Sequence, residues 1–132
     1  MKNRIIRIDQ KNANKILLSL RNDPNTFCVE IEGSNCKVSL DYLTEVSTKF
    51  QFPIISKGYD GYEDWIRDLT WIKEENIAII INNYCKLLCD EPSKKCLVLN
   101  SFEEVVFPWW ESEVCEHMVE GKTRSFIVYL IN

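Results

Sequence analysis

Three aspartates spaced four residues apart are the side chains best placed to do chemistry in this sequence. Asp60, Asp64 and Asp68 would share one face of a helix, because residues i and i+4 are neighbours on a helix surface. Paired carboxylates can act as acid and base or hold a metal ion, but such sites need further groups. The sequence has no nucleophile motif, glycine-rich phosphate loop or histidine cluster to join them. We therefore rank catalysis, including metal-dependent hydrolysis, below two other interpretations: a solvated helix face, or a surface that binds a basic partner.

The cysteines offer little support for a metal site. There are six Cys and one His in the chain, and the closest cysteine pair, Cys85 and Cys89, has the spacing C-x₃-C. Zinc sites favour C-x₂-C pairs or clustered histidines, and His117 is alone. A Cys–His catalytic pair of Cys115 and His117 is disfavoured because residues two apart point to different faces of a helix. We expect reduced thiols, no metal and no cofactor.

The negative charge of the chain is concentrated in two segments. The 132 residues carry 16 Lys and Arg against 20 Asp and Glu, a formal net charge of −4. Residues 60–75 hold six acids against two bases, and residues 103–120 hold six acids and no base, so the remaining residues sum to +6. Focused negative potential of this kind attracts a basic partner. The acidic balance also argues against a nucleic-acid binder, which needs basic surface to neutralise phosphates.

Hydrophobic periodicity indicates the elements that would position these acids. Apolar residues at helical spacing predict helices over 12–21, 40–50 and 60–72, and from Ser101 to about Met118 with a kink at Pro108. Alternating or wholly apolar runs predict strands over 27–32, 77–81 and 126–131. Ser39, Asp60 and Ser101 are expected to begin helices, the last two in capping-box patterns. Residues 84–100 are ambiguous, and residues 1–8 fit either a frayed end or a short strand.

Strands that alternate with helices predict an α/β fold. We expect a small three-stranded parallel sheet with right-handed crossovers, covered by helices mainly on one face. The length fits a single domain over residues 1–132, with residues 1–12 as a frayed extension. The longest apolar run, 126–131, is too short to span a bilayer, and the first ten residues lack the apolar core of a secretory signal. These features predict a cytoplasmic protein that binds no membrane.

The adjacent tryptophans Trp109 and Trp110 are expected to have different roles. Neighbouring residues on a helix point about 100° apart, so one indole should enter the core while the other faces outward. Tryptophan is enriched at the energetic centres of interfaces. Trp110 is accordingly a candidate contact for a partner.

One segment resembles a known family. Phe52-Pro53, Gly58–Tyr62, Asp64–Leu69 and Trp71-Ile72 are similar to the signature of barstar-related proteins, in which an F-P pair precedes a glycine-containing loop and an aspartate-rich helix. The weaker resemblance of the surrounding elements extends over about residues 13–131. It implies a barstar-like fold and an immunity protein that plugs the active site of a secreted ribonuclease toxin.

The resemblance also implies which residues would touch the toxin. By position, Asp60 and Asp64 match the two helix aspartates that enter the phosphate-binding cleft, and Tyr59 matches the aromatic position before them. Glu63 and Asp68 are neighbouring acids on the same predicted helix. An acid of the later helix also contributes in the family. Here the candidates are Glu104, with Glu103 and Glu111 as alternatives.

Several residues depart from the family pattern. The loop FPIISKGYD is one residue shorter than usual, and Ile54 and Ile55 replace expected tyrosines. Glu63 stands where an aromatic residue can occur, and Trp65 replaces a small cysteine. We therefore expect a toxin unlike the family's usual target. The alternative hypothesis is a non-catalytic regulatory or scaffolding domain with no nuclease partner, whose acids only increase its solubility.

Overall fold

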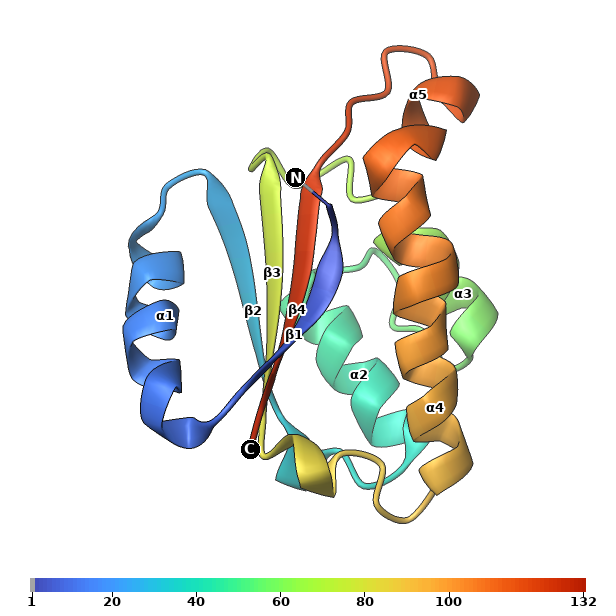
Figure 1. Cartoon of the computed structure of the whole chain (residues 1–132). Helices are drawn as coiled ribbons and strands as arrows, with labels where there is room; N and C mark the ends of the chain where they lie inside the picture. The colour runs from blue at the N-terminus through green and yellow to red at the C-terminus, as the bar shows by residue number, and fades with distance from the viewer. Residues whose placement is uncertain (1) are drawn as a thin grey trace.

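The computed structural model describes residues 2–132 and shows a parallel sheet with helices on both faces (Figure 1). The strands are β1 (Arg4–Ile8), β2 (Thr26–Glu32), β3 (Asn76–Asn82) and β4 (Ser125–Ile131). The helices are α1 (Gln10–Asn22), α2 (Ser39–Lys49), α3 (Tyr59–Ile66), α4 (Pro92–Ser101) and α5 (Val114–His117). The strand order is β1-β4-β3-β2 and every pair is parallel. The α/β class was therefore predicted correctly, but the number of strands was not.

The strand that the sequence did not establish is β1. It lies at the edge of the sheet and pairs only with β4, from Arg4 opposite Ile127 to Ile8 opposite Ile131. An edge strand can keep charged side chains, and the pattern Arg-Ile-Ile-Arg-Ile leaves both arginines exposed. The predicted three-stranded sheet is wrong because this mixed pattern carries a weak signal. The apolar run 77–81 of β3, by contrast, occupies the interior of the sheet as predicted.

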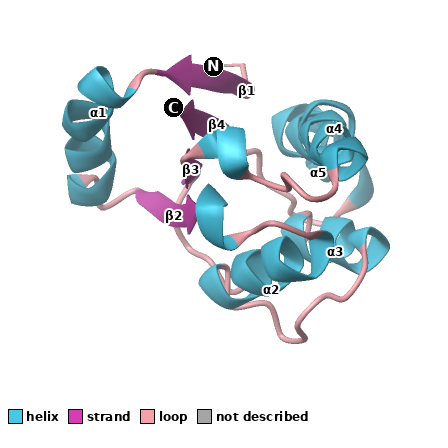
Figure 2. Cartoon of the chain, turned by 90° about the horizontal axis from the view of Figure 1, so that it is seen from below, coloured by secondary structure: helices cyan, strands magenta, loops and turns pink. Residues whose placement is uncertain are grey.

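The helices divide unequally between the two faces (Figure 2). Helix α1 alone covers one face, where Ala13 and Leu17 pack against Ile80 and Ile131 in a small cluster. The opposite face carries α2, α3 and the long helix that begins with α4. The main core lies between these three helices and the sheet. None of the helices in residues 2–132 has both the length and the apolarity needed to cross a membrane.

Several helix boundaries differ from those predicted. Helix α2 has Val38 as its N-cap rather than Ser39, and α3 has Gly58 as its N-cap, without a side-chain cap. Ser101 lies inside a continuous helix that begins at Pro92, a position where the missing proline N–H would be unsatisfied in any case. Helix α3 ends at Ile66, six residues before the predicted end, because the chain turns at Leu69, which has a φ of 50°.

The long helix continues past Pro108 instead of breaking there. Two π-helical segments, Phe102–Val106 and Trp109–Glu113, flank the proline and connect α4 to α5. A π-turn is wider than an α-turn and is often found at functional sites. The buried amide of Asn3 fastens this helix to the sheet, because its Nδ2 donates to the carbonyls of Phe107 and Arg124.

Candidate functional site

Helix α3 is the element on which the predicted contacts converge, and its N-terminal half is fixed by hydroxyl groups. The buried hydroxyls of Tyr42 and Tyr62 are hydrogen-bonded at 2.8 Å, and their rings pack edge to face. The Tyr59 hydroxyl donates to Ser39 Oγ, also at 2.8 Å. Burial raises the pKa of both Tyr42 and Tyr62, so these phenols stay neutral and the hydrogen bond persists over the ordinary pH range.

The C-terminal end of α3 is fixed by donors to its carbonyl groups. Trp110 Nε1 donates to the carbonyl of Ile66 at 3.0 Å. The half-buried Arg124 guanidinium donates to the carbonyls of Leu69, Ile72 and Glu74 in the segment that follows α3, and its burial lowers the pKa of Arg124. The last carbonyls of a helix have no partner within the helix, so the bond from Trp110 satisfies one of them, and the bonds from Arg124 hold the segment that leaves α3. The helix is therefore held at both ends.

The aspartates predicted to form one row do not all lie on the helix. Asp60 and Asp64 belong to α3 and are exposed. Asp68 follows the end of the helix and is half-buried, with Oδ1 accepting from the backbone N–H of Thr70. The prediction of three carboxylates on one helical face is wrong, because the periodic apolar residues continue beyond the point where the chain leaves the helix. Asp60 and Asp64 remain as two exposed carboxylates one turn apart on α3.

Two other predicted contacts are partly withdrawn from the surface. Glu63 is half-buried, and its Oε2 accepts from Ser101 Oγ of α4 at 2.5 Å, so this carboxylate faces the long helix. Tyr59 is also half-buried, stands edge to face with Tyr62, and uses its hydroxyl within the protein. Both side chains support the position of α3 as well as lying beside its exposed face.

The two tryptophans have roles opposite to those expected. Trp110 is only 3% exposed, so a role as a surface anchor does not fit its position. Trp109 is the more exposed of the pair, with its ring stacked on His117 and facing the Arg67 guanidinium. The sequence establishes that the two indoles diverge, but not which one enters the core.

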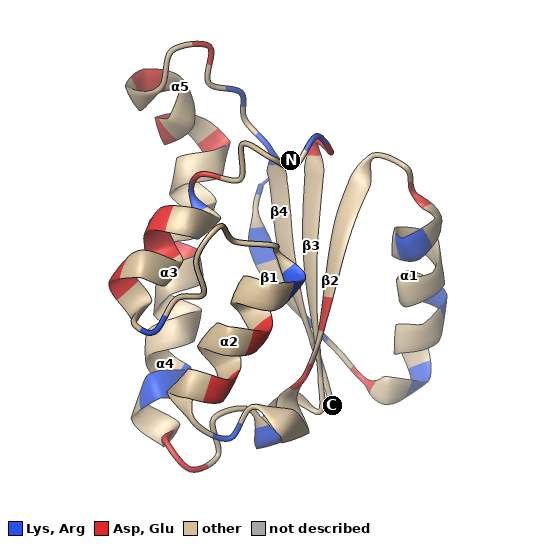
Figure 3. Cartoon of the chain, turned by 180° about the vertical axis from the view of Figure 1, so that it is seen from behind, with Lys and Arg blue, Asp and Glu red and all other residues tan. Residues whose placement is uncertain are grey.

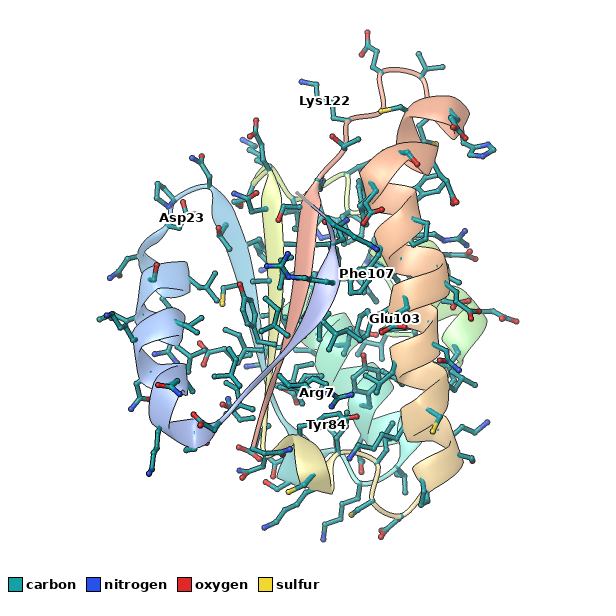
Figure 4. All side chains as sticks on the ribbon, viewed as in Figure 1. Arg7, Asp23, Tyr84, Glu103, Phe107 and Lys122 are labelled. Atoms are coloured by element: carbon teal, nitrogen blue, oxygen red, sulfur yellow. The ribbon has the colours of Figure 1, made fainter. Side chains whose placement is uncertain are left out.

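The acidic residues of the long helix lie on different flanks. Glu103 and Glu111 line a hollow beside β1 together with Lys2 and Arg4, and Figure 4 shows Glu103 and Phe107 on this side of the helix. Glu104 is exposed and does not line that hollow. It follows Ser101, the residue that contacts α3, by three positions. Of the three candidate glutamates, Glu104 has the geometry best suited to extend the acidic surface of α3.

The loop before α3 presents apolar side chains to solvent. Ile54 is 68% exposed and Ile55 is 49% exposed. The ends of the loop are fixed, because Phe52 is buried and the backbone N–H of Ser56 donates to Ser47 Oγ at 3.0 Å. The two isoleucines therefore lie between two fixed points of the loop that leads into α3. These are the two isoleucines that stand where the family resemblance predicted tyrosines.

A groove of about 620 Å³ at the other end of α3 was not foreseen. It brings Asp64 and Asp68 together with Trp109 and with Met118 and Val119 of the turn after α5. These residues are up to 55 positions apart, so no local pattern predicts their meeting. Within residues 2–132 no cluster of three or more His, Cys, Asp or Glu side chains could hold a metal ion.

The sequence model of one protein family, described as Barstar (barnase inhibitor), matches residues 26–130. The match runs from the start of β2 almost to the end of β4 and leaves β1 and α1 outside it. It therefore begins later than residue 13, where the resemblance was placed from the sequence. No curated protein and no solved structure matches the chain.

Proposed function

Because the chain belongs to the barstar family, we propose that it inhibits a ribonuclease-type toxin by placing the exposed face of α3 and the preceding loop in the enzyme's active site. The family is one of inhibitors rather than enzymes. The observation that carries the proposal is the pair Asp60 and Asp64, exposed one turn apart on a helix that is fixed at both ends.

The chemistry of a ribonuclease active site suits this pair. Such a site binds phosphate groups with basic side chains, and carboxylates held about one helical turn apart can occupy the same positions. Their fixed placement limits the conformational entropy lost on binding. Net negative charge would also accelerate the encounter with a basic enzyme, an effect that falls as salt is added.

The neighbouring residues would define which enzyme is bound. Ile54 and Ile55 offer exposed apolar contact in the loop before α3, where the family usually carries tyrosines. Glu104 would add a third carboxylate from the long helix. In this proposal the protein acts in the bacterial cytoplasm as an immunity protein, and it blocks the toxin without any covalent step.

The proposal is tested by measuring RNA cleavage by the nuclease domain encoded beside this gene, with barnase as a second, defined enzyme. Asp60→Asn/Asp64→Asn should weaken inhibition by at least about 100-fold, since removing one partner of a close charge pair costs about 2–5 kcal/mol. The measured example behind that range is the barnase–barstar complex itself, so it is a calibration rather than an independent estimate. The matched control is Glu75→Gln/Asp90→Asn, which removes two exposed acids away from α3.

The outcomes separate the alternatives. Inhibition that is lost in the α3 variant and kept in the control supports the proposal. Equal inhibition by the two variants would show that another surface binds the nuclease. No inhibition of either enzyme by the unaltered protein would favour a regulatory or scaffolding role.

A further inference from the structure

The groove at the C-terminal end of α3 has two chemically different walls. Trp109, Val114, Met118 and Val119 form an apolar wall, while Asp64 and Asp68 lie on the side of α3. Met118 is 51% exposed and Val119 is 96% exposed, so the turn after α5 presents apolar surface at the rim. A long side chain with an apolar stem and a cationic head fits such a combination, because Lys and Arg bury their stems and keep their charges at polar groups.

The protein's own Arg67 already shows how a guanidinium is held at this place. Its Nη2 lies 3.1 Å from Asp64 Oδ1, its Nε donates to the carbonyl of Glu63 at 3.2 Å, and its Cζ lies 5.7 Å from the centre of the Trp109 ring. The groove therefore offers a guanidinium both a carboxylate and an indole face, the two groups that bind it best. The Asp64 side chain remains 75% exposed, so its pair with Arg67 is of the weak, solvent-screened kind.

Among the three cations that line the groove, Arg67 is the one that lies between Asp64 and Trp109. Three acids, Asp64, Asp68 and Glu120, are balanced by Arg67, Lys122 and Arg124. Arg124 is committed to three backbone carbonyls. Lys122 lies in the turn after α5, at the outer end of the long helix (Figure 4). If Arg67 moved into solvent, the groove would have an excess of one negative charge, which another guanidinium would restore to balance.

We propose that this groove binds an arginine side chain of the partner protein, which replaces Arg67 between Asp64 and Trp109 and lays its stem along Met118 and Val119. This rests on the proposed function, because it gives Asp64 a specific role in the same binding surface. Arginine fits better than lysine, since only the planar guanidinium stacks on the indole while pairing with a carboxylate. Arg67 then acts as an internal competitor that lowers the affinity for the partner.

The groove can be tested without the nuclease. The probe is the dipeptide acetyl-Leu-Arg-amide, and its matched control carries citrulline, which has the same shape without the charge. The resonances of the Trp109 indole N–H and the Met118 methyl group report occupancy by NMR. We expect saturable shifts with the arginine peptide, much smaller shifts with the citrulline peptide, and weaker binding by Asp64→Asn. Arg67→Ala should bind the arginine peptide about two- to fivefold more tightly, the range expected for loss of an exposed competing ion pair.

Several results would overturn the proposal. These are equal binding of the two peptides, no saturable shift, or unchanged affinity in Arg67→Ala. Binding of acetyl-Leu-Glu-amide instead would show that Lys122 and Arg124 make the groove an anion site. A failed peptide titration would leave the nuclease assay unaffected, whereas peptide binding without nuclease inhibition would refute the proposed function alone.

Discussion

Trp110 is expected to stabilise the protein rather than contact a partner, and Trp110→Phe tests this. The substitution removes the Nε1–H that donates to the carbonyl of Ile66 at 3.0 Å, and it leaves that carbonyl without its donor. It also removes part of a side chain that is 3% exposed and lies under the Arg124 guanidinium. The lost hydrogen bond contributes about 1 kcal/mol and the cavity about 1–3 kcal/mol, so we expect the free energy of unfolding to fall by about 2–4 kcal/mol.

The measurement is urea unfolding, with Trp109→Phe as the matched control. Trp109 is half-buried, and its Nε1 has no hydrogen-bond partner within residues 2–132. Its substitution should therefore cost about 1 kcal/mol or less. The reasoning would be refuted if both variants lost equal stability, or if Trp110→Phe weakened nuclease binding while its unfolding curve stayed unchanged.

Three further predictions concern the scaffold. Gly33→Ala should destabilise the protein by about 1–3 kcal/mol in thermal unfolding, because its Cβ would lie 2.4 Å from the Asn83 carbonyl oxygen; Gly58→Ala, whose Cβ meets nothing within 4 Å, is the control. Asn3→Ala should cost about 2–4 kcal/mol and accelerate amide hydrogen exchange in β4, since the buried amide links that strand to the long helix. Hydrogen bonds from Ser34 and Asn83 lower the pKa of Glu32 below its usual 4.5. Its contribution to stability is therefore complete above that pH and is lost as the pH falls through the lower folded value, so Glu32→Gln should flatten the acid limb of a stability-against-pH curve.

The parts of the molecule that the sequence could predict are those with strong local periodicity. The apolar strand β3 and the exposed positions of Asp60 and Asp64 follow from patterns within a few residues of each other. The end of α3 could not be predicted in this way, because apolar residues at helical spacing continue into the turn at Leu69. There the side chains are buried although the backbone is no longer helical. Strand β1 was uncertain because its apolar pattern is weak. An edge strand can keep charged residues and needs little alternation of apolar and polar side chains.

The candidate functional surface could likewise be predicted only in part. Asp60 and Asp64 could be chosen from spacing and resemblance, whereas the choice between Trp109 and Trp110 depends on how the long helix is rotated about its axis. That rotation is set by packing against α3 and the sheet, and by two π-helical segments that no periodicity rule anticipates. The groove depends in addition on the turn after α5, which is distant from α3 in sequence.

The segment that precedes the family match is basic, whereas the matched segment is acidic. Residues 1–25 carry six bases and two acids, a net charge of +4, whereas residues 26–132 carry ten bases and eighteen acids, a net charge of −8. The two sum to the −4 of the whole chain. Helix α1 covers one face of the sheet, and α3 and the long helix lie over the other (Figure 3). Only three of the six bases, Lys11, Lys15 and Arg21, belong to α1, while Lys2 and Arg4 line the hollow beside the long helix, so the α1 face carries little net charge. A basic enzyme would therefore be attracted mainly to the acidic α3 side. Replacing the exposed Lys11 and Lys15 of α1 with glutamine makes the protein more negative and should raise its association rate with a basic enzyme. The dissociation rate should stay unaltered, because neither residue lies on the α3 side.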